Sequence, residues 1–392
     1  MDKKDKRLAI NGGQPVTKDF IIIHKPSIED DDIAIVSEAV RSTFVSGDGP
    51  KCREFEKMLA EYIGAKHVFF TNSCTAALDL AFMIKDYPSG SEVIVPNFTY
   101  TSTALAPILN NLKVVLADVG PFTGNIDASK IEALITDKTV AICPVDYAGN
   151  PADMQDVNRI ARNHGLYVVH DTAQSLGSTY YNRKTGTLAD VSCFSFHGTK
   201  NITTGEGGAL VTDDDEIAEK VKVARDKGTD KFSFISDPEK KGFYEYVSLG
   251  NSYVQSNILG ALGISQLKKL DRLNHRRKEI AEYYCKELEG LEEIILPPAE
   301  EFKTRNWHIF YLLVKPENRL WIIDALKAEG IGSNVHYNPL HLNAYYESLG
   351  KGRDLKNSEK FYHMLVRIPV YPALTDEEAK NVIIAVKKVL GY

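Results

Sequence analysis

A lysine, Lys200, lies in a glycine-rich loop between two short apolar runs at residues 191–196 and 209–211. Apolar runs of this length are typical of buried strands, and the glycines between them let the backbone turn tightly and approach a ligand. A lysine in a loop is usually a solvated surface charge. Lys200 can do covalent chemistry only if burial and neighbouring charges favour its neutral, nucleophilic amine.

Three further chemical groups follow predicted strands elsewhere in the chain. Asp171 and Tyr100 each come after an apolar run, and the turn at residues 73–75 joins another run to a helix. Taken alone, each has an ordinary explanation: a structural carboxylate, a core aromatic and a helix N-cap. The turn also suits a phosphate, because the N–H groups and dipole of a helix N-terminus attract anions.

Strand-like and helix-like segments alternate from residue 68 to residue 171. We expect helices at residues 51–63, 76–84, 103–109, 128–135 and 154–164, with short strands between them. This alternation predicts a parallel sheet with helices on both faces, in which ligands bind at the carboxyl ends of the strands. After residue 255 the pattern changes, so we expect a large domain at 1–255 and a small α+β domain at 256–392. The large domain begins with an irregular arm, in which residues 20–23 are a candidate short strand.

These groups have one common explanation if they meet at one edge of the sheet. A lysine, a phosphate-binding turn, a carboxylate and a stacking aromatic are what a protein needs to use pyridoxal 5'-phosphate (PLP). Lys200 would form a Schiff base with the cofactor. Asp171 would keep the pyridine nitrogen protonated, so that the ring accepts electrons when a Cα proton leaves.

Several segments also carry a resemblance to a known family: residues 11–16, 45–50, 73–78, 144–149, 171–174, 195–208 and 335–341. On these segments the chain resembles the DegT/DnrJ/EryC1/StrS sugar aminotransferases over nearly its whole length, and the block at 195–208 is highly specific. The resemblance implies an α/β protein of PLP fold type I, like aspartate aminotransferase. Its large domain would have a mostly parallel central sheet flanked by helices, and its C-terminal domain would be a smaller α+β unit.

The resemblance also implies which residues surround the cofactor ring. Lys200 would be the catalytic residue, which holds the cofactor and moves the proton between the substrate Cα and the cofactor. Asp171 would pair with the pyridine nitrogen and Gln174 with the ring hydroxyl. Tyr100 matches the stacking aromatic of the family.

On the phosphate side, the resemblance implies contacts from Cys74, Thr75 and Ser195. Many members have Gly where Cys74 stands, but the backbone N–H that binds phosphate is unchanged. Many also have an Asn in a G-x-N-Y segment that reaches the phosphate of the neighbouring subunit. Here residues 250–253 read G-N-S-Y, so either Ser252 or Asn251 would make that contact.

His336 and His341 are close enough in sequence to suggest a metal site, but no carboxylate or Cys ligand lies near them. Zinc sites need three or four converging ligands, so we expect no metal. The two histidines would instead line the substrate entrance, or His336 is an ordinary strand residue. Arg225 and residues 227–231 could bind a diphosphate, but a solvated helix end is the simpler expectation.

The composition excludes several other classes of protein. The chain has 392 residues and a net charge of -6, with no long basic run, which argues against nucleic acids and anionic membranes as partners. No apolar stretch approaches the ~18 residues of a membrane span, and we expect no signal peptide. The five cysteines are scattered without a C-x-x-C pair, which indicates reduced thiols and a cytoplasmic location.

The expected function is conversion of a nucleotide-linked 4-keto-6-deoxy sugar, dTDP-linked in the subgroup that the chain resembles most, to the 4-amino sugar. L-Glutamate would be the amino donor, and a homodimer would have its active sites at the subunit interface. Alternatives are amination at C3, a UDP or GDP carrier, a sugar 3-dehydratase and a non-catalytic sensor. The dehydratases carry His where Lys200 stands. A nicotinamide oxidoreductase is disfavoured because no G-x-G-x-x-G follows the first strand.

Overall fold

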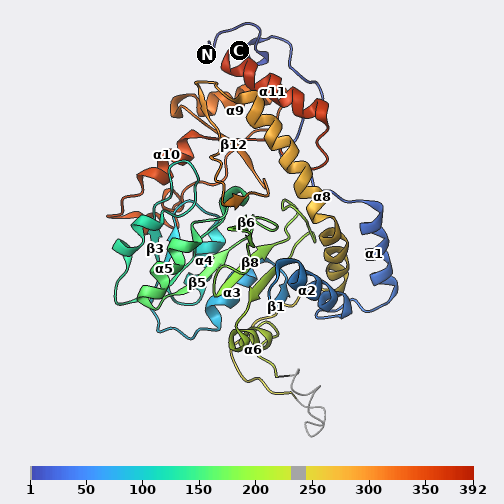
Figure 1. The fold of residues 1–392 in the computed structure, drawn as a ribbon, viewed down its shortest axis with the longest axis vertical. Helices are drawn as coiled ribbons and strands as arrows, with labels where there is room; N and C mark the ends of the chain where they lie inside the picture. Colours follow the sequence, from blue (N-terminus) through green and yellow to red (C-terminus); the bar gives the residue numbers. More distant parts are fainter. Residues whose placement is uncertain (1, 231–243) are drawn as a thin grey trace.

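The computed structural model describes residues 2–230 and 244–392, which form a large lobe and a smaller lobe (Figure 1). The large lobe contains a seven-stranded sheet in the order β1-β9-β8-β5-β4-β2-β3. The strands from β8 to β3 are parallel, whereas β9 is antiparallel to both its neighbours. The bounds are β1 His67–Thr71, β2 Glu92–Pro96, β3 Lys113–Ala117, β4 Thr139–Ile142, β5 Tyr167–Asp171, β8 Val191–Ser195 and β9 Gly208–Thr212. The sheet is mostly parallel, as predicted.

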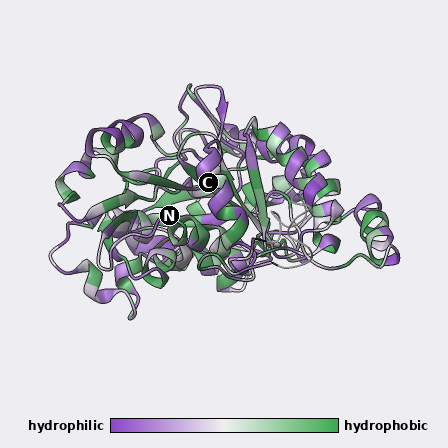
Figure 2. Cartoon of the chain, turned by 90° about the horizontal axis from the view of Figure 1, so that it is seen from below, coloured by the Kyte–Doolittle hydropathy of each residue, from purple (hydrophilic) through white to green (hydrophobic). Residues whose placement is uncertain are grey.

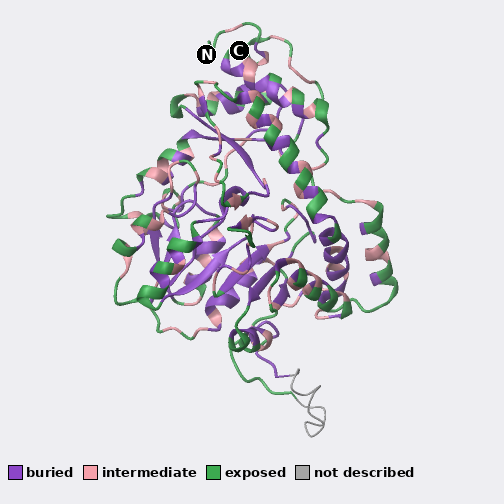
Figure 3. Cartoon of the chain, in the orientation of Figure 1, coloured by how far each residue is buried: buried purple, intermediate pink, exposed green. Residues whose placement is uncertain are grey.

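The apolar sequences of these strands explain their central position. Successive side chains of a strand point to opposite faces of the sheet, so a strand that is apolar throughout needs cover on both sides. In β2, Val93 and Val95 pack in one core with the helices α3 (Cys74–Met83) and α4 (Thr101–Leu109), and Ile94 packs in another core with α5 (Met154–His164). Figure 3 shows the strands of the sheet buried while the outer sides of the helices are exposed.

Helices cover both faces of the sheet, and in Figure 2 hydrophilic and hydrophobic residues alternate along the outer helices. This is the pattern of amphipathic helices, which bury one side only. One face packs against α3 Cys74–Met83, α4 Thr101–Leu109 and α6 Asp215–Ala224. The other packs against α5 Met154–His164, α2 Pro50–Ile63 and the first half of α8 Asn257–Leu288.

Two expected elements are absent from this part of the chain. The helix expected at 128–135 is instead two short 3-10 turns, Ala128–Lys130 and Glu132–Leu134. Only Ile131 is fully buried in this segment, so it lacks the apolar stripe that holds a longer helix on a core. The short strand considered at 20–23 is reduced to a single bridge between Ile21 and Ile331.

The smaller lobe has an antiparallel sheet in the order β10-β12-β13, with helices packed against it. The bounds are β10 Ile294–Ile295, β12 Phe310–Val314, β13 Leu365–Ile368, α9 Arg319–Ala328, α10 Lys356–Met364 and α11 Asp376–Leu390. A third small sheet contains β6 Thr179–Tyr180, β7 Arg183–Lys184 and β11 Lys303–Thr304.

The long helix α8 Asn257–Leu288 connects the two lobes (Figure 1). Its residues up to Leu273 pack in the core that contains α2, whereas its residues from Ile280 onward pack in the core of the smaller lobe. We therefore propose a domain boundary inside α8, between Leu273 and Ile280, rather than at residue 255.

The N-terminal arm leads to α1 Asp30–Arg41, which packs beside α8. The two ends of the chain lie close together on the smaller lobe (Figure 1). Among the helices of the described residues, none combines the length and the apolar character needed to cross a bilayer.

Candidate active site

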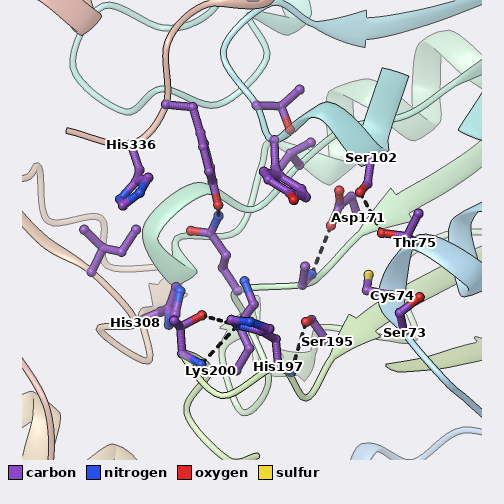
Figure 4. A pocket seen from close by; sticks show the side chains of 18 of the residues that line it. Ser73, Cys74, Thr75, Ser102, Asp171, Ser195, His197, Lys200, His308 and His336 are labelled. Atoms are coloured by element: carbon purple, nitrogen blue, oxygen red, sulfur yellow. Dashed lines mark hydrogen bonds between the residues drawn. The ribbon is translucent and has the colours of Figure 1, made fainter. Parts of the chain in front are cut away.

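A cavity of about 480 Å³ lies at the carboxyl ends of the parallel strands. The large lobe contributes the first turns of α3 and α4, the ends of β5 and β8 and the loop that contains Lys200. The smaller lobe contributes His308, His336, Tyr337 and Arg367, and the arm contributes His24. Figure 4 shows side chains from different elements around this space, among them Asp171, Lys200 and His336. The structure therefore places groups that are far apart in the sequence around one space.

Lys200 lies in the loop between β8 and β9, and its backbone N–H donates to the carbonyl of His197 at 2.8 Å. The side chain lines the cavity, and burial lowers the pKa of its amine. Gly208 begins β9 directly against the first turn of α3: a Cβ there would lie 2.3 Å from the backbone N of Cys74. Only a glycine allows this approach, which brings the Lys200 loop next to the turn at 73–75.

Asp171 ends β5 with its side chain in the cavity and only 5% of its surface exposed. Its Oδ2 accepts a hydrogen bond from Thr103 at 2.8 Å, and its Oδ1 accepts one from the backbone N–H of Ala173 at 3.1 Å. Burial raises the pKa of this carboxyl group, while the two donors and the nearby Lys200 oppose that rise. The site thus holds a desolvated carboxylate with few protein partners, which favours a cationic ligand group.

Gln174 also lines the cavity and is held at both ends of its amide. Its Oε1 accepts from the backbone N–H of Ala148 at 2.8 Å, and its Nε2 donates to the hydroxyl of Tyr337 at 3.3 Å. These bonds fix the amide with its nitrogen toward Tyr337. Gln174 therefore presents a donor to the cavity.

The turn at 73–75 begins α3, and Ser73 caps the helix by accepting from the backbone N–H of Ala76 at 3.0 Å. Thr75 shares a hydrogen bond of 2.7 Å with Ser102 in the first turn of α4. Ser195 ends β8 on the other side of the cavity. N–H groups at the starts of two helices and three hydroxyl groups thus gather at one end of the cavity, an arrangement that suits an anion. The N-cap by Ser73 is confirmed, and it is compatible with a phosphate at the same turn.

Tyr100 lies just before α4 and lines the cavity mouth, where 55% of its surface is exposed. Its ring centroid is 5.6 Å from that of Tyr337, at an interplanar angle of 48°. The alternative that Tyr100 is a core aromatic is therefore wrong for this chain. An exposed ring at a cavity mouth is available to a flat ligand.

The structure does not bring every predicted residue to the cavity. His341 lies outside it: its Nδ1 bonds to the side chain of Asn97 and its Nε2 lies 3.0 Å from a carboxylate oxygen of Glu359. Both ring nitrogens are thus used within the chain, so the expected substrate contact from His341 is not supported. Asn251 and Ser252 are exposed on the large lobe and are also outside the cavity.

Arg225 is not the solvated helix end that we expected. Its guanidinium is buried and forms salt bridges with Glu56 and, at 3.3 Å, with Asp48. It is therefore not available to a diphosphate in this chain. Of the neighbouring stretch 227–231, Lys227 pairs with Asp226, and residue 231 lies outside the described residues.

Sequence reasoning missed four residues that line the cavity, His24, His308, Tyr337 and Arg367, and also Thr103, which donates to Asp171. The signal for Arg367 was present, because an arginine inside the apolar run at 365–370 has to be buried or turned into a cavity. The others come from loops or from separate elements, and no local pattern in the sequence indicates that they meet.

His308 connects the cavity to the segment that follows Lys200. The amide nitrogen of Asn201 donates to Asn274 and to the carbonyl of Asn306, so its Oδ1 must be the atom that meets His308 Nδ1 at 3.1 Å. Nδ1 therefore carries the proton of the neutral ring, and burial holds the pKa of His308 well below its ordinary value. The histidine fixes the loop that positions Lys200.

Comparisons with known proteins agree with this geometry. The sequence pattern of the DegT/DnrJ/EryC1/StrS aminotransferase family matches residues 26–387. The chain belongs to this family.

The aminotransferase has named relatives over nearly its whole length. It is 37% identical to the spore coat polysaccharide biosynthesis protein SpsC of Bacillus subtilis, over 95% of this chain and 97% of that one. It is 34% identical to the GDP-perosamine synthase of Caulobacter vibrioides, with 94% and 98% covered. It is also 34% identical to the UDP-4-amino-4,6-dideoxy-N-acetyl-beta-L-altrosamine transaminase of Campylobacter jejuni, with 91% and 94% covered.

Solved structures show the same fold. Helicobacter pylori PseC, an aminotransferase involved in the biosynthesis of pseudoaminic acid, has a TM-score of 0.88 and 31% identity, with 95% of this chain and 99% of that one covered. A putative sugar aminotransferase of Streptococcus pneumoniae, Spr1654, is known in PMP and PLP forms; its PLP form has a TM-score of 0.87 and 29% identity, with 95% and 98% covered. The enzyme is a PLP-dependent nucleotide-sugar aminotransferase of fold type I.

The residues in the cavity fit this cofactor. Its aldehyde reacts with an amine, and its ring nitrogen pairs with a carboxylate. Its ring hydroxyl binds a hydrogen-bond donor, and its phosphate binds an anion site. Lys200, Asp171, Gln174 and the turn at 73–75 line a single cavity and would supply these four partners. When bound, the cofactor supplies the electron sink for amino transfer.

Proposed function

We propose that Lys200 is the catalytic residue, which binds the cofactor and moves the proton in both half-reactions. A lowered amine pKa supports this role, because a general base works best when its pKa lies near the operating pH. Asp171 would stabilise the protonated ring nitrogen, and Gln174 would donate to the ring hydroxyl. Tyr100 would cover the ring from the cavity mouth.

For the phosphate, we propose the backbone N–H groups of Cys74 and Thr75 and the hydroxyls of Thr75 and Ser195. A contact from Ser252 or Asn251 of a second subunit would complete the site. In this chain both residues are exposed and outside the cavity, which is the placement that a contact with a partner requires. This contact implies a homodimer with its active sites at the subunit interface. The free cysteines, four of them buried, support a cytoplasmic location.

The substrate we propose is a nucleotide-linked 4-keto-6-deoxy sugar, which the enzyme converts to the 4-amino sugar with L-glutamate as amino donor. The name of the Campylobacter jejuni relative specifies a 4-amino-4,6-dideoxy sugar, which supports amination at C4 of a 6-deoxy sugar. The names of two relatives specify a GDP-linked and a UDP-linked sugar, so these nucleotide carriers have more support than the dTDP carrier that we first expected. His336 at the cavity would contact the substrate.

The observation that carries this function is the convergence of Lys200, Asp171 and the anion site on one cavity in a chain of this family. A sugar 3-dehydratase is disfavoured, because those enzymes carry His at the position of Lys200. The test is a panel of GDP-, UDP- and dTDP-linked 4-keto-6-deoxy sugars with L-glutamate, in which 2-oxoglutarate and the amino sugar are measured. We expect both products in equal amounts. Release of 2-oxoglutarate without any amino sugar from the panel would contradict the proposed acceptor.

A further inference from the structure

The N-terminal arm forms part of the cavity wall. Ile23 and His24 of the arm line the cavity. The Nε2 atom of His24 lies 2.8 Å from the carbonyl oxygen of Gly198, which comes shortly before Lys200 in the sequence. The arm is therefore in direct contact with the loop that presents the lysine.

The helix α8 fixes the arm beside this loop. The buried side chain of Gln266 donates to the carbonyl of Ser27 in the arm at 2.8 Å. The same side chain accepts from the backbone N–H of Thr203, in the Lys200 loop, at 3.2 Å. The arm and the loop thus share one anchor, and this anchor keeps His24 at the cavity.

The contact with Gly198 determines which nitrogen of the His24 ring carries the proton. A carbonyl oxygen only accepts, so Nε2 is protonated and donates. Burial, together with the charges of Arg277 and Arg367, lowers the pKa of His24 to about 4, so the ring is neutral at physiological pH. Nδ1 is then a bare acceptor, and no donor from residues 2–230 or 244–392 is hydrogen-bonded to it.

A bare imidazole nitrogen selects ligand groups that donate a hydrogen bond. It repels carboxylate and phosphate oxygens, which offer only lone pairs at neutral pH. L-Glutamate has two carboxylates and one amino group, and the amino group is the one that is transferred. A sugar ring, in contrast, carries hydroxyl groups, and an acylamino sugar also has an amide N–H. The acceptor sugar therefore suits Nδ1 and the amino donor does not.

The place of His24 beside the Lys200 loop restricts which part of a nucleotide sugar it meets. The carbon that is aminated must lie at Lys200, and the diphosphate is attached across the sugar ring from C4. The nucleotide base, which also has N–H donors, lies beyond the diphosphate. The donor nearest to the Lys200 loop is therefore on the sugar itself.

We propose that Nδ1 of His24 accepts a hydrogen bond from the acceptor sugar, donated by a ring hydroxyl or by an acylamino N–H. The inference rests on the proposed function, in which the acceptor is a nucleotide-linked ketosugar. The two nitrogens of His24 then have different tasks: Nε2 holds the Lys200 loop and Nδ1 binds the sugar. The arm thereby contributes to the choice of substrate.

Two variants separate these tasks. In His24→Gln the terminal amide reaches the position of Nε2 and can still donate to Gly198, but the acceptor at Nδ1 is lost. In His24→Asn the amide reaches only the position of Nδ1, so an acceptor remains while the bond to Gly198 is lost. His275→Gln, at an exposed position on α8, is the control.

The two half-reactions of the cofactor-loaded enzyme are measured separately. Stopped-flow absorbance follows the loaded enzyme with L-glutamate, and then the aminated enzyme with the ketosugar. The acceptors are the preferred ketosugar and analogues in which one hydroxyl, or the acylamino group, is replaced by hydrogen. Calorimetry measures binding of the amino-sugar product to the aminated enzyme, a pair that cannot react.

For His24→Gln we expect kcat/KM for the ketosugar and the affinity for the amino sugar to fall about 5- to 10-fold, as for the loss of one hydrogen bond between neutral groups. The L-glutamate half-reaction should stay within about 2-fold of wild type, and His275→Gln should match wild type in both half-reactions. The analogue that lacks the donor should show no difference between wild type and His24→Gln. His24→Asn should slow both half-reactions, because the Lys200 loop loses its contact.

Three results would overturn the assignment and leave the proposed function intact: an unchanged ketosugar reaction in His24→Gln, equal losses in its two half-reactions, or a difference from wild type that persists with every analogue. If the wild-type enzyme gives no amino sugar with any ketosugar, the proposed acceptor fails, and the inference fails with it.

Discussion

Thr103 donates a hydrogen bond of 2.8 Å to the carboxylate of Asp171, and both side chains are buried. Because an ionised carboxylate only accepts, the one proton of Thr103 is committed to it. The contact of 2.8 Å between Thr99 and Thr103 must then have Thr99 as donor. Two hydroxyl groups thus form a chain with a fixed direction that supports the charged form of Asp171.

This chain predicts the effect of Thr103→Val. Loss of the donor raises the pKa of Asp171 further and weakens its pairing with the cofactor ring, so kcat should fall about 10- to 100-fold, the range expected for one hydrogen bond to a charged group. Thr103→Ser restores the hydroxyl and should recover most of the activity. The pH dependence of the cofactor absorbance provides a second readout, and an unchanged titration in Thr103→Val would show that the contact is only structural.

The lowered pKa of Lys200 predicts a cost to stability in the cofactor-free protein. Burial lowers the pKa of the Lys200 amine in the folded protein below its value in the unfolded chain. Above the unfolded-state pKa the amine is neutral in both states, and its burial costs no stability. As the pH falls from there through the folded-state pKa, the buried amine becomes charged and stability is lost. At pH 7 Lys200→Met should therefore raise the apparent Tm by about 2 °C or more. The gain should shrink toward pH 10.5, whereas Lys220→Met, at an exposed position, should leave Tm unchanged at both pH values. A gain that grows with pH would contradict the sign.

The buried cluster of Arg225 predicts a large structural loss. Arg225→Leu leaves the carboxylates of Glu56 and Asp48 buried without their cation, which costs about 3–5 kcal/mol. Scanning calorimetry of the cofactor-loaded enzyme should show a clear drop in Tm. Arg159→Leu removes an exposed arginine with only surface ion pairs and should change stability by about 0.5 kcal/mol or less. Similar Tm values for the two variants would contradict the assignment of Arg225 to the core.

His341 should matter for stability and not for substrate binding. Its ring joins Asn97, at the end of β2, to Glu359 in α10, so His341→Ala should destabilise the protein by about 1–3 kcal/mol. The KM values for both substrates should stay within about 2-fold of wild type. A KM that rises by an order of magnitude with little loss of stability would contradict this structural role and support the substrate contact that we first expected.

The large lobe could be predicted well because its signals are local. Apolar runs at 92–96 and 167–171 and the Ser73 cap mark strands and a helix start without reference to the rest of the chain. The segment at 128–135 has residues that favour a helix, but only one of them is buried in the folded protein. One buried side chain does not hold a longer helix on the core, and this becomes visible only in the tertiary packing. Arg367 and His308 could not be assigned to the site, because their function depends on the approach of the smaller lobe to Lys200.

The most direct test of the account is the site at which the cofactor is attached. The PLP-loaded enzyme is treated with borohydride, digested and analysed by mass spectrometry. We predict that the cofactor mass is found on the peptide that contains Lys200, and that Lys200→Ala gives neither this adduct nor turnover. An adduct on a different lysine, or undiminished turnover in Lys200→Ala, would contradict the account.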